Sequence, residues 1–274
     1  EKLICLLKPD KNRLPSLWTI HRTMKNIDFN DLNTIFEKWS RQHIEIKKKE
    51  WISLDGKAIK GTIPDELHKF VNLVSLFCVE KKLVYSMGNV DKKSNEIPKV
   101  QKLIDNFSAT GVIFRMDALH CQKKTVKSIL RKESFYVLEA KDNQKTLHRK
   151  VKFIAETLPA VSSHRTSEKN RGRREIRTVT THKEHLDLKY GWNDLKLIIK
   201  VHRKVKHNTG KISEETAYFI SNLEEKASFF NKGIRWHWRI ENSLHYVKDV
   251  VFKEDRLKIR LGNAPQNMSL LRTW

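Results

Sequence analysis

The order of apolar runs between residues 51 and 158 constrains the fold more than any other feature. The run at 51–61 reads as a strand, and two runs flanking Glu80, Lys81 and Lys82 predict an antiparallel hairpin over 72–91. Helical and extended patterns then alternate, with helices at 94–108, 121–133 and 143–158 and strands at 111–118 and 134–141. Three antiparallel strands followed by such units indicate an α/β fold with a mixed sheet and flanking helices.

The remaining sequence divides around this block. Residues 1–48 carry apolar side chains at helical spacing, with Ser16 placed to cap a helix. The expected organisation is therefore an N-terminal helical segment (1–48), a first part of the core (49–157), a basic β-rich insertion (158–221) and a second part of the core (222–274). The insertion is expected to contain strands at 195–206 and 215–223, and a long helix is expected over 233–252.

The charge of the chain restricts its partners. It has 55 Lys and Arg against 32 Asp and Glu, a formal net charge of +23. Residues 141–183 hold 12 basic and 4 acidic side chains, so they contribute 12 − 4 = +8 of that total. Such an excess favours a polyanionic partner, most often nucleic acid.

The same composition argues against several other classes of protein. No window approaches 18 consecutive apolar residues, so a membrane span is not expected. No secretory leader is recognisable, and three widely spaced cysteines favour a reducing compartment over a disulfide framework. The cysteines lack a CxxC spacing, which argues against structural zinc.

Two aspartates stand at the ends of apolar runs. Asp55 follows the run 51–54, and Asp117 follows the run 112–116. A carboxylate at the end of a buried strand needs a hydrogen bond, an ion pair or a cation. Turn chemistry at Asp55-Gly56, or helix capping by Asp117, would also explain these residues.

A third carboxylate, Glu241, lies on the helix expected near the C-terminus. One stripe of that helix is apolar, and Glu241 borders it with His237 and His245 one turn away on either side. The stripe consists of Trp236, Ile240, Leu244, Val247 and Val251. This position could deliver Glu241 to a site beneath the helix, although an exposed Glu in contact with the two histidines remains an alternative.

Two strand-end aspartates and a helical glutamate suit magnesium. Mg²⁺ prefers hard oxygen ligands, and two such ions ~3.5–4 Å apart can activate an attacking oxygen and stabilise a leaving one in phosphoryl displacement. A phosphodiester is also the substrate that a strongly basic protein attracts. Charge and carboxylates therefore predict the same kind of reaction.

Four segments give the sequence a recognisable resemblance. ISLDGKAIKGT, FRMDALHCQK, VLEAKDNQKTL and IRWHWRIENSLHYVKDVVFKED occur in this order, and GNAPQNMSLLR follows them. Together they resemble the DDE transposases of bacterial insertion sequences, and in particular the H-repeat-associated group. The resemblance extends from PSLWTIHRTM to NMSLLR, and members of the family normally have additional sequence on both sides.

The resemblance implies a fold, an activity and partners. It implies an RNase H-like sheet in which Asp55, Asp117 and Glu241 are the catalytic, metal-binding residues, 62 and 124 residues apart (117 − 55 and 241 − 117). It implies two Mg²⁺ ions, with Mn²⁺ as a substitute, and cleavage of element ends in double-stranded DNA followed by strand transfer. A homodimer on DNA, in the cytoplasm at the nucleoid, is expected. An RNase H-like nuclease without strand transfer, or a degraded or domesticated element that only binds DNA, are the alternatives.

Several basic residues are candidates for contacts with DNA. The wider superfamily carries a Tyr-x₂-Arg-x₃-Glu-x₆-Lys signature, whose slots here hold Ile234, His237, Glu241 and Lys248, so only the last two agree. A histidine or lysine near the scissile phosphate could still contact it. The full set expected to bind DNA comprises Lys57, Lys60, Arg171, Arg173, Arg174, His237 and Lys248. For the lysines after Asp55 and for the arginine-rich loop, a solvated charged surface is the alternative.

Overall fold

A computed structural model provides the structure, which describes residues 13–62, 71–90, 96–170, 172–183, 192, 194–236 and 240–273. Its α-helices are α2 (Leu17–Asn26), α3 (Phe29–His43), α4 (Glu96–Asn106), α5 (Lys123–Arg131), α6 (Lys145–Thr157), α7 (Ala227–Trp236) and α9 (Ala264–Leu271). Its strands are β1 (Trp51–Ile59), β2 (Val71–Cys78), β3 (Leu83–Val90), β4 (Ile113–Met116), β5 (Phe135–Ala140), β6 (Ser162–Asn170), β7 (Arg173–Lys183), β8 (Leu197–His207) and β9 (Ile212–Ser221). Among the described residues, no helix is long and apolar enough to cross a membrane.

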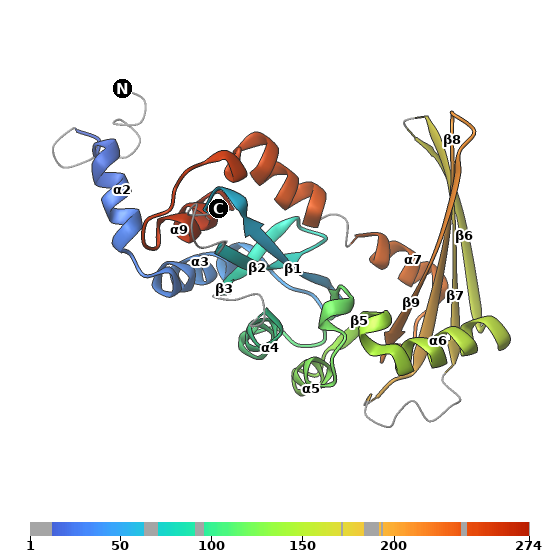
Figure 1. The fold of residues 1–274 in the computed structure, drawn as a ribbon. Helices are drawn as coiled ribbons and strands as arrows, with labels where there is room; N and C mark the ends of the chain where they lie inside the picture. The colour runs from blue at the N-terminus through green and yellow to red at the C-terminus, as the bar shows by residue number, and fades with distance from the viewer. Residues whose placement is uncertain are drawn as a thin grey trace.

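The described strands form one mixed sheet in the order β3-β2-β1-β4-β5-β9-β8-β7-β6. β1 pairs with β4, and β4 with β5, in parallel, and the other neighbouring pairs are antiparallel. The predicted hairpin and the alternating helices and strands that follow it are confirmed. The chain is thus an α/β protein with a large, mostly antiparallel sheet and flanking helices (Figure 1).

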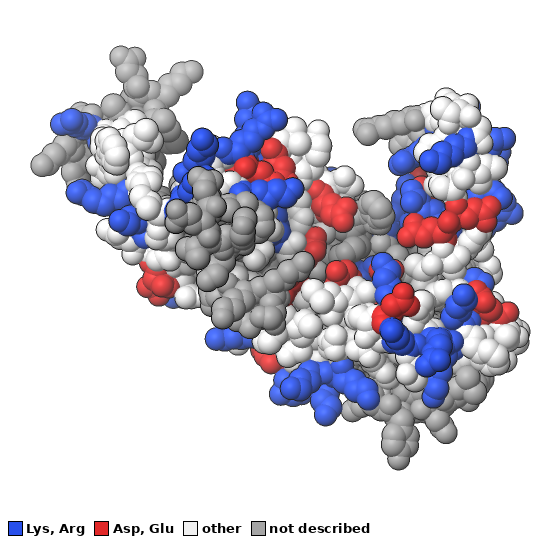
Figure 2. Space-filling model, in the orientation of Figure 1, with Lys and Arg blue, Asp and Glu red and all other residues white. Residues whose placement is uncertain are grey.

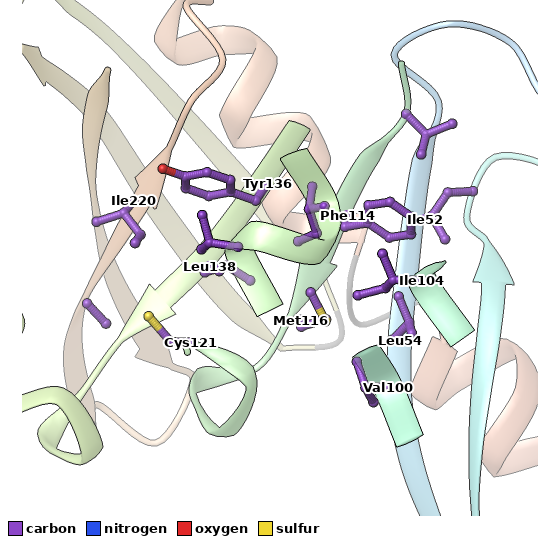
Figure 3. Packing of buried hydrophobic residues seen from close by; sticks show 14 of the residues in the cluster. Ile52, Leu54, Val100, Ile104, Phe114, Met116, Cys121, Tyr136, Leu138 and Ile220 are labelled. Atoms are coloured by element: carbon purple, nitrogen blue, oxygen red, sulfur yellow. The ribbon is translucent and has the colours of Figure 1, made fainter. Parts of the chain in front are cut away.

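Alternation along the strands gives the sheet two apolar faces. Ile52 and Leu54 of β1 belong to a cluster with Val100 and Ile104 of α4, and Phe114 of β4 lies in the same cluster (Figure 3). Trp51, one residue away on β1, packs in the opposite cluster with residues of α3 and α7. The odd-numbered positions of β1 therefore face α7 and the C-terminal segments, while the even-numbered positions face α4, α5 and α6.

The two N-terminal helices differ in how they pack. The side chain of Ser16 accepts a hydrogen bond from the Thr19 amide at 3.2 Å, which confirms it as the cap of α2. α3 buries Phe29 and Phe36. α2 buries no residue, and Leu17 is 81% exposed. The predicted helix is present, and it lies against α9, where the side-chain amide of Asn267 donates to the Met24 carbonyl at 2.8 Å.

Residues 162–221 form four long antiparallel strands that extend beyond the helices (Figure 1). β8 and β9 match the predicted strands, and β9 joins the group to the rest of the sheet by pairing with β5. The hairpin of β6 and β7 was not predicted, because β6 (SSHRTSEKN) contains no apolar residue. β6 is an edge strand, and charged or polar residues are typical there because they discourage pairing with another chain.

The helix that carries Glu241 has an unexpected pitch. Glu241–His245 and Val247–Val251 are π-helical, so each turn is wider than in an α-helix. Ile240 and Leu244 are buried as predicted, but Val251 is 64% exposed and Lys248 is only 2% exposed. The predicted burial of Val251 is therefore wrong. A π-helix has more than four residues per turn, so position 248 lies on the buried face in place of position 251.

Candidate active site

Register brings the two aspartates to neighbouring positions. β1 and β4 run parallel, and their last paired residues are Ser53 and Arg115. Two residues further on, the same register leads to Asp55 on one strand and to Asp117, directly after the other. Because side chains alternate across a sheet, both aspartates share the face of Trp51 and Ile113, which the C-terminal segments cover.

The local backbone settles the alternatives left open for these aspartates. Asp55 lies within β1, where it pairs with Ser75 of β2, so Asp55-Gly56 is not a turn. Asp117 does cap a short 3₁₀ turn at Ala118–His120, and its Oδ1 accepts a hydrogen bond from the Leu119 amide at 3.1 Å. Capping uses one carboxylate oxygen, so it fixes the side chain without exhausting its lone pairs.

The electrostatics of Asp55 are unusual for a carboxylate. Burial, together with repulsion from Asp117, Glu241 and Glu96, raises the pKa of Asp55 to about 7, although a hydrogen bond from the Gly56 amide opposes the shift. The His245 imidazole lies nearby, with Nδ1 3.5 Å from Asp55 Oδ2. Burial lowers the pKa of His245 to about 4, with help from the cations nearby, so the neutral ring gives Asp55 no compensating charge. The site thus gathers negative charge.

Glu241 faces the same region from the helical side. Its side chain is exposed, and together with Asp117 it lines a cavity of about 240 Å³. Arg115 and Glu139 line the same cavity from β4 and β5. The carboxylate thus borders this cavity although it is exposed to solvent.

Sequence reasoning missed two further acidic residues at this site. Glu96, at the start of α4, reaches Gly56 so closely that a Cβ on that glycine would lie 2.9 Å from Glu96 Oε1. Its Oε1 also lies 3.2 Å from Nε2 of His120. Glu139, near the end of β5, contacts Lys141 at 3.0 Å and Arg115 at 3.8 Å. The end of a buried strand could have pointed to Glu139, whereas nothing in the sequence marks Glu96.

Asp55, Asp117 and Glu241 carry the oxygen donors that suit a divalent metal, but among the described residues they are not gathered into a complete ligand set. Their oxygens are the ligands that Mg²⁺ prefers, and the pKa of Asp55 is raised by burial and also by repulsion from the other carboxylates, which a cation would relieve. In the part of the chain that the structure describes, no three His, Cys, Asp or Glu side chains lie close enough together to hold a metal ion.

The three lysines expected to contact DNA are placed differently. Lys57 Nζ contacts Asp249 at 2.5 Å and Asp255 at 3.5 Å, and its side chain is 11% exposed. Lys60 is 72% exposed, with Nζ 3.8 Å from Asp255. Lys248 is buried, and its Nζ donates to the hydroxyl of Ser269 at 3.1 Å. Burial lowers the pKa of Lys248 to about 8. Of these three lysines, only Lys60 presents its ammonium openly to a partner in this conformation.

The arginine-rich segment lies far along the strands from the carboxylates. Arg173 and Arg174 are exposed at the start of β7, and Arg174 Nε donates to the Ser167 hydroxyl at 3.2 Å. Arg171 and His237 lie outside the described residues. Figure 2 shows lysines and arginines gathered near the free ends of the long strands and over the side formed by α5 and α6. Arg173 and Arg174 thus lie on a different strand from the aspartates, whereas Lys57 shares β1 with Asp55.

Comparison with known proteins gives consistent results. The profile of the family described as "Transposase DDE domain" matches residues 39–274. "Putative transposase YncI" of Escherichia coli O157:H7 is 33% identical, over 94% of this chain and 69% of that protein. "H repeat-associated putative transposase YhhI" of Escherichia coli K12 is 32% identical, over 96% of this chain and 72% of that protein.

Comparison with solved structures adds nothing on the fold. The crystal structure of Streptomyces venezuelae DesVI aligns with 48% of this chain and 52% of its own, at 11% identity and a TM-score of 0.22. A score at that level does not indicate a shared fold. The sequence comparisons decide the family: this chain belongs to the transposase DDE domain family.

Proposed function

We propose that this chain is the catalytic region of an insertion-sequence transposase, which hydrolyses phosphodiester bonds at the ends of its element and then transfers the freed strand. One observation carries the proposal. Asp55 and Asp117 lie on one face of two adjacent parallel strands, close enough to each other and to Glu241 that both neighbours raise the pKa of Asp55. Two carboxylates that both repel a third suit a divalent metal and the phosphate it would hold.

The roles of the three residues follow from their positions. Asp55 must lose its proton before it can bind a metal, so its raised pKa couples metal binding to pH. Asp117 is oriented by its hydrogen bond with the Leu119 amide and keeps a second oxygen for coordination. Glu241 belongs to a separate segment, so its distance from the aspartates depends on the position of the helix that carries it. A pair of Mg²⁺ ions, or of Mn²⁺ ions, would supply activation of the attacking oxygen and stabilisation of the leaving oxygen.

The wider organisation is part of the proposal. The mixed order of β3, β2, β1, β4 and β5, with Asp55 on β1 and Asp117 directly after β4, supports an RNase H-like core formed by residues 49–157 and 222–274. Residues 158–221 would be an insertion in this core, and residues 1–48 an accessory helical segment. The substrate would be double-stranded DNA, which the names of the relatives and the charge of +23 support. Two chains would act together as a homodimer at the two ends of the element, at the bacterial nucleoid.

Nicking of terminal-repeat DNA tests the proposal. The purified chain is incubated with a duplex that carries the end of its own element, with Mg²⁺ and with EDTA. We expect metal-dependent nicking at the end of the element and joining of the freed 3′-hydroxyl to a target duplex. Nicking without joining would indicate a plain nuclease, and binding without nicking would indicate a protein that only binds DNA.

A further inference from the structure

A second cleft lies beside the carboxylates, between α7 and the face of β6, β7 and β8. It has a volume of about 760 Å³ and is lined by five lysines and arginines but only one carboxylate, Glu175. The five cations come from two strands, β7 and β8, and from α7. They are Arg173, Arg177, Arg203, Lys232 and Arg235, and His164 lies beside them. We call this site the basic cleft.

Register explains why the strands contribute charge to one side. Arg177 pairs with Arg203 across β7 and β8, and with Thr166 across β6 and β7, so these three side chains share a face. Nearer β5, the same face is apolar, and Val201 and Phe219 pack there with Ile234 of α7. The basic cleft begins where this apolar contact ends.

Arg177 is the unusual residue in this cleft. It is only 8% exposed, yet its Nε and Nη1 have no hydrogen-bond partner. Its ion-pair contact runs from Nε to Glu175 Oε1 at 3.7 Å, and Glu175 is held more closely by Arg203, at 2.9 Å. A buried guanidinium with unused donors is costly, and an anion within the cleft would satisfy it.

The cations around Arg177 are partly neutralised. Both terminal nitrogens of Arg235 donate hydrogen bonds to the carboxylate of Glu168. Lys232, one turn earlier on α7, lies with Nζ 4.7 Å from the ring centre of Trp236. An aromatic face leaves the ammonium its hydrogen-bond donors, so Lys232 and Arg177 are the cations best placed to receive an anion.

The basic cleft continues into the carboxylate cavity. Arg177 and Arg203 line both spaces, and Asp117 and Glu241 line the second. We propose that the basic cleft binds the phosphodiester backbone of the DNA strand next to the bond that is cut, with Arg177 as its anchor and Lys232 as a second contact. This inference rests on the proposed DNA substrate. Arg177 would be a positioning residue, since it would fix the strand while the carboxylates act on the neighbouring phosphate.

The chemistry of the cleft favours phosphate over other anions. A planar guanidinium matches two phosphate oxygens and holds them in a fixed orientation. A repeating anion is also needed to reach from the cleft to the carboxylates, and the DNA backbone provides one. Contacts of this kind position a strand without reading its sequence, so the cleft should bind DNA of any sequence.

Binding measured in EDTA tests the cleft without any cleavage. Anisotropy with a short labelled duplex of arbitrary sequence gives the affinity at several salt concentrations for wild type, Arg177→Met and Lys232→Met. Arg149→Met is the matched control, because Arg149 is exposed on α6, which packs on the opposite face of the sheet. Each cleft variant should reduce the magnitude of the negative slope of log K against log salt by about 1 and should weaken binding at low salt. The control should change neither quantity.

Neutral methylphosphonate linkages, placed one at a time along a terminal-repeat duplex, locate the contact. A linkage that weakens binding by wild type but not by Arg177→Met marks the phosphate that Arg177 holds, and it should lie within a few nucleotides of the nicked bond. If Arg177→Met does not fold, judged by circular dichroism, the same comparison with Lys232→Met replaces it.

An unchanged slope in folded Arg177→Met, or in Lys232→Met, would overturn the inference, and so would a marked phosphate far from the nicked bond. A protein that passes the binding test but never nicks DNA would overturn the proposed function and leave the cleft in place.

Discussion

The two halves of the sheet handle charge in opposite ways. On β6 to β9 and on α7 beside them, cations and anions pair: Arg203 with Glu175, Lys204 with Glu214, and Arg235 of α7 with Glu168 of β6. At β1 and β4, like charges are gathered, and their repulsion adds to burial in raising the pKa of Asp55 to about 7. Net charge alone therefore says little about where a ligand belongs. The informative groups are those whose charge is poorly balanced, the carboxylates in one half and Arg177 in the other.

Removing a carboxylate should produce the largest effect. In Asp117→Asn the side chain keeps its size and can still accept the hydrogen bond from the Leu119 amide, but it loses the charge that holds a metal. Because metal stabilisation is worth several kcal/mol, nicking of terminal-repeat DNA should fall by about 10³-fold. Gel assays of nicking and anisotropy measurements of binding separate the two functions.

DNA binding by Asp117→Asn in EDTA should match or slightly exceed that of wild type, since a negative charge has been removed. Glu241→Gln should behave in the same way. Arg149→Met serves again as the control with full activity. Nicking near the wild-type rate by either variant would remove that residue from the site.

Asp55 should make the stability of the metal-free protein depend on pH. The pKa of Asp55 is raised on folding, so the folded state disfavours the charged form of this side chain. The resulting loss of stability develops as the pH rises from the unfolded pKa of 3.8 to the folded pKa of about 7, and it is complete above that pH. Asp55→Asn removes the penalty, and above pH 7 it should raise the free energy of unfolding by about 2 kcal/mol, with no such gain near pH 4. Urea denaturation at both pH values, in EDTA, measures the difference.

Mg²⁺ should reduce the difference in stability between wild type and Asp55→Asn above pH 7. A cation that binds the ionised carboxylates stabilises the native state of wild type, but Asp55→Asn provides fewer ligands and should respond less. Thermal melts with and without Mg²⁺ at a pH above 7 test this. A stability gain of Asp55→Asn that is the same at both pH values would contradict the assigned pKa.

The core elements around the carboxylates could be predicted because their patterns are local. Alternating apolar runs define the strands, and the positions of Asp55 and Asp117 at the ends of such runs already indicate that the two side chains lie near each other. Nothing local encodes Glu96, which reaches Gly56 from the start of α4 through the tertiary packing. β6 was missed for a related reason: as a polar edge strand, it is held by its pairing with β7 and not by an apolar pattern of its own.

The helix of Glu241 shows the limit of periodicity. An ideal α-helical wheel placed Val251 inside, but in the π-helical turns Val251 is exposed and Lys248 is buried. Lys248 is accommodated because Ser269 accepts a hydrogen bond from it. Such a change of pitch depends on neighbouring segments, which a single sequence window does not contain.

Substitution of Lys57 tests whether this lysine, which lies next to the acidic site, stabilises the fold. It contacts Asp249 and Asp255 with little exposure, so its substitution strands two acidic groups next to the already acidic site. Lys57→Met should lower the free energy of unfolding by about 1–3 kcal/mol, a range suited to a partly buried pair. Urea denaturation measures this, and Lys60→Met, at an exposed position, is the matched control with a change below about 0.5 kcal/mol. The salt dependence of DNA binding by the same two variants tests their expected contacts with phosphate.

The smallest effect is expected at the exposed start of β7. Arg173 and Arg174 belong to the basic half, but they lie at the surface, where salt screens each charge and water competes for each hydrogen bond. Arg173→Gln/Arg174→Gln should therefore weaken DNA binding only a few-fold at moderate salt, while lowering the slope of log K against log salt by about 0.9 for each phosphate that the variant no longer neutralises. Anisotropy titrations over a range of salt measure the slope, and melting in the absence of DNA should be unchanged because neither side chain is buried. An unchanged slope would mean that these two arginines, including Arg173 at the edge of the basic cleft, are a solvated surface, and that binding by the cleft depends on Arg177 and Lys232.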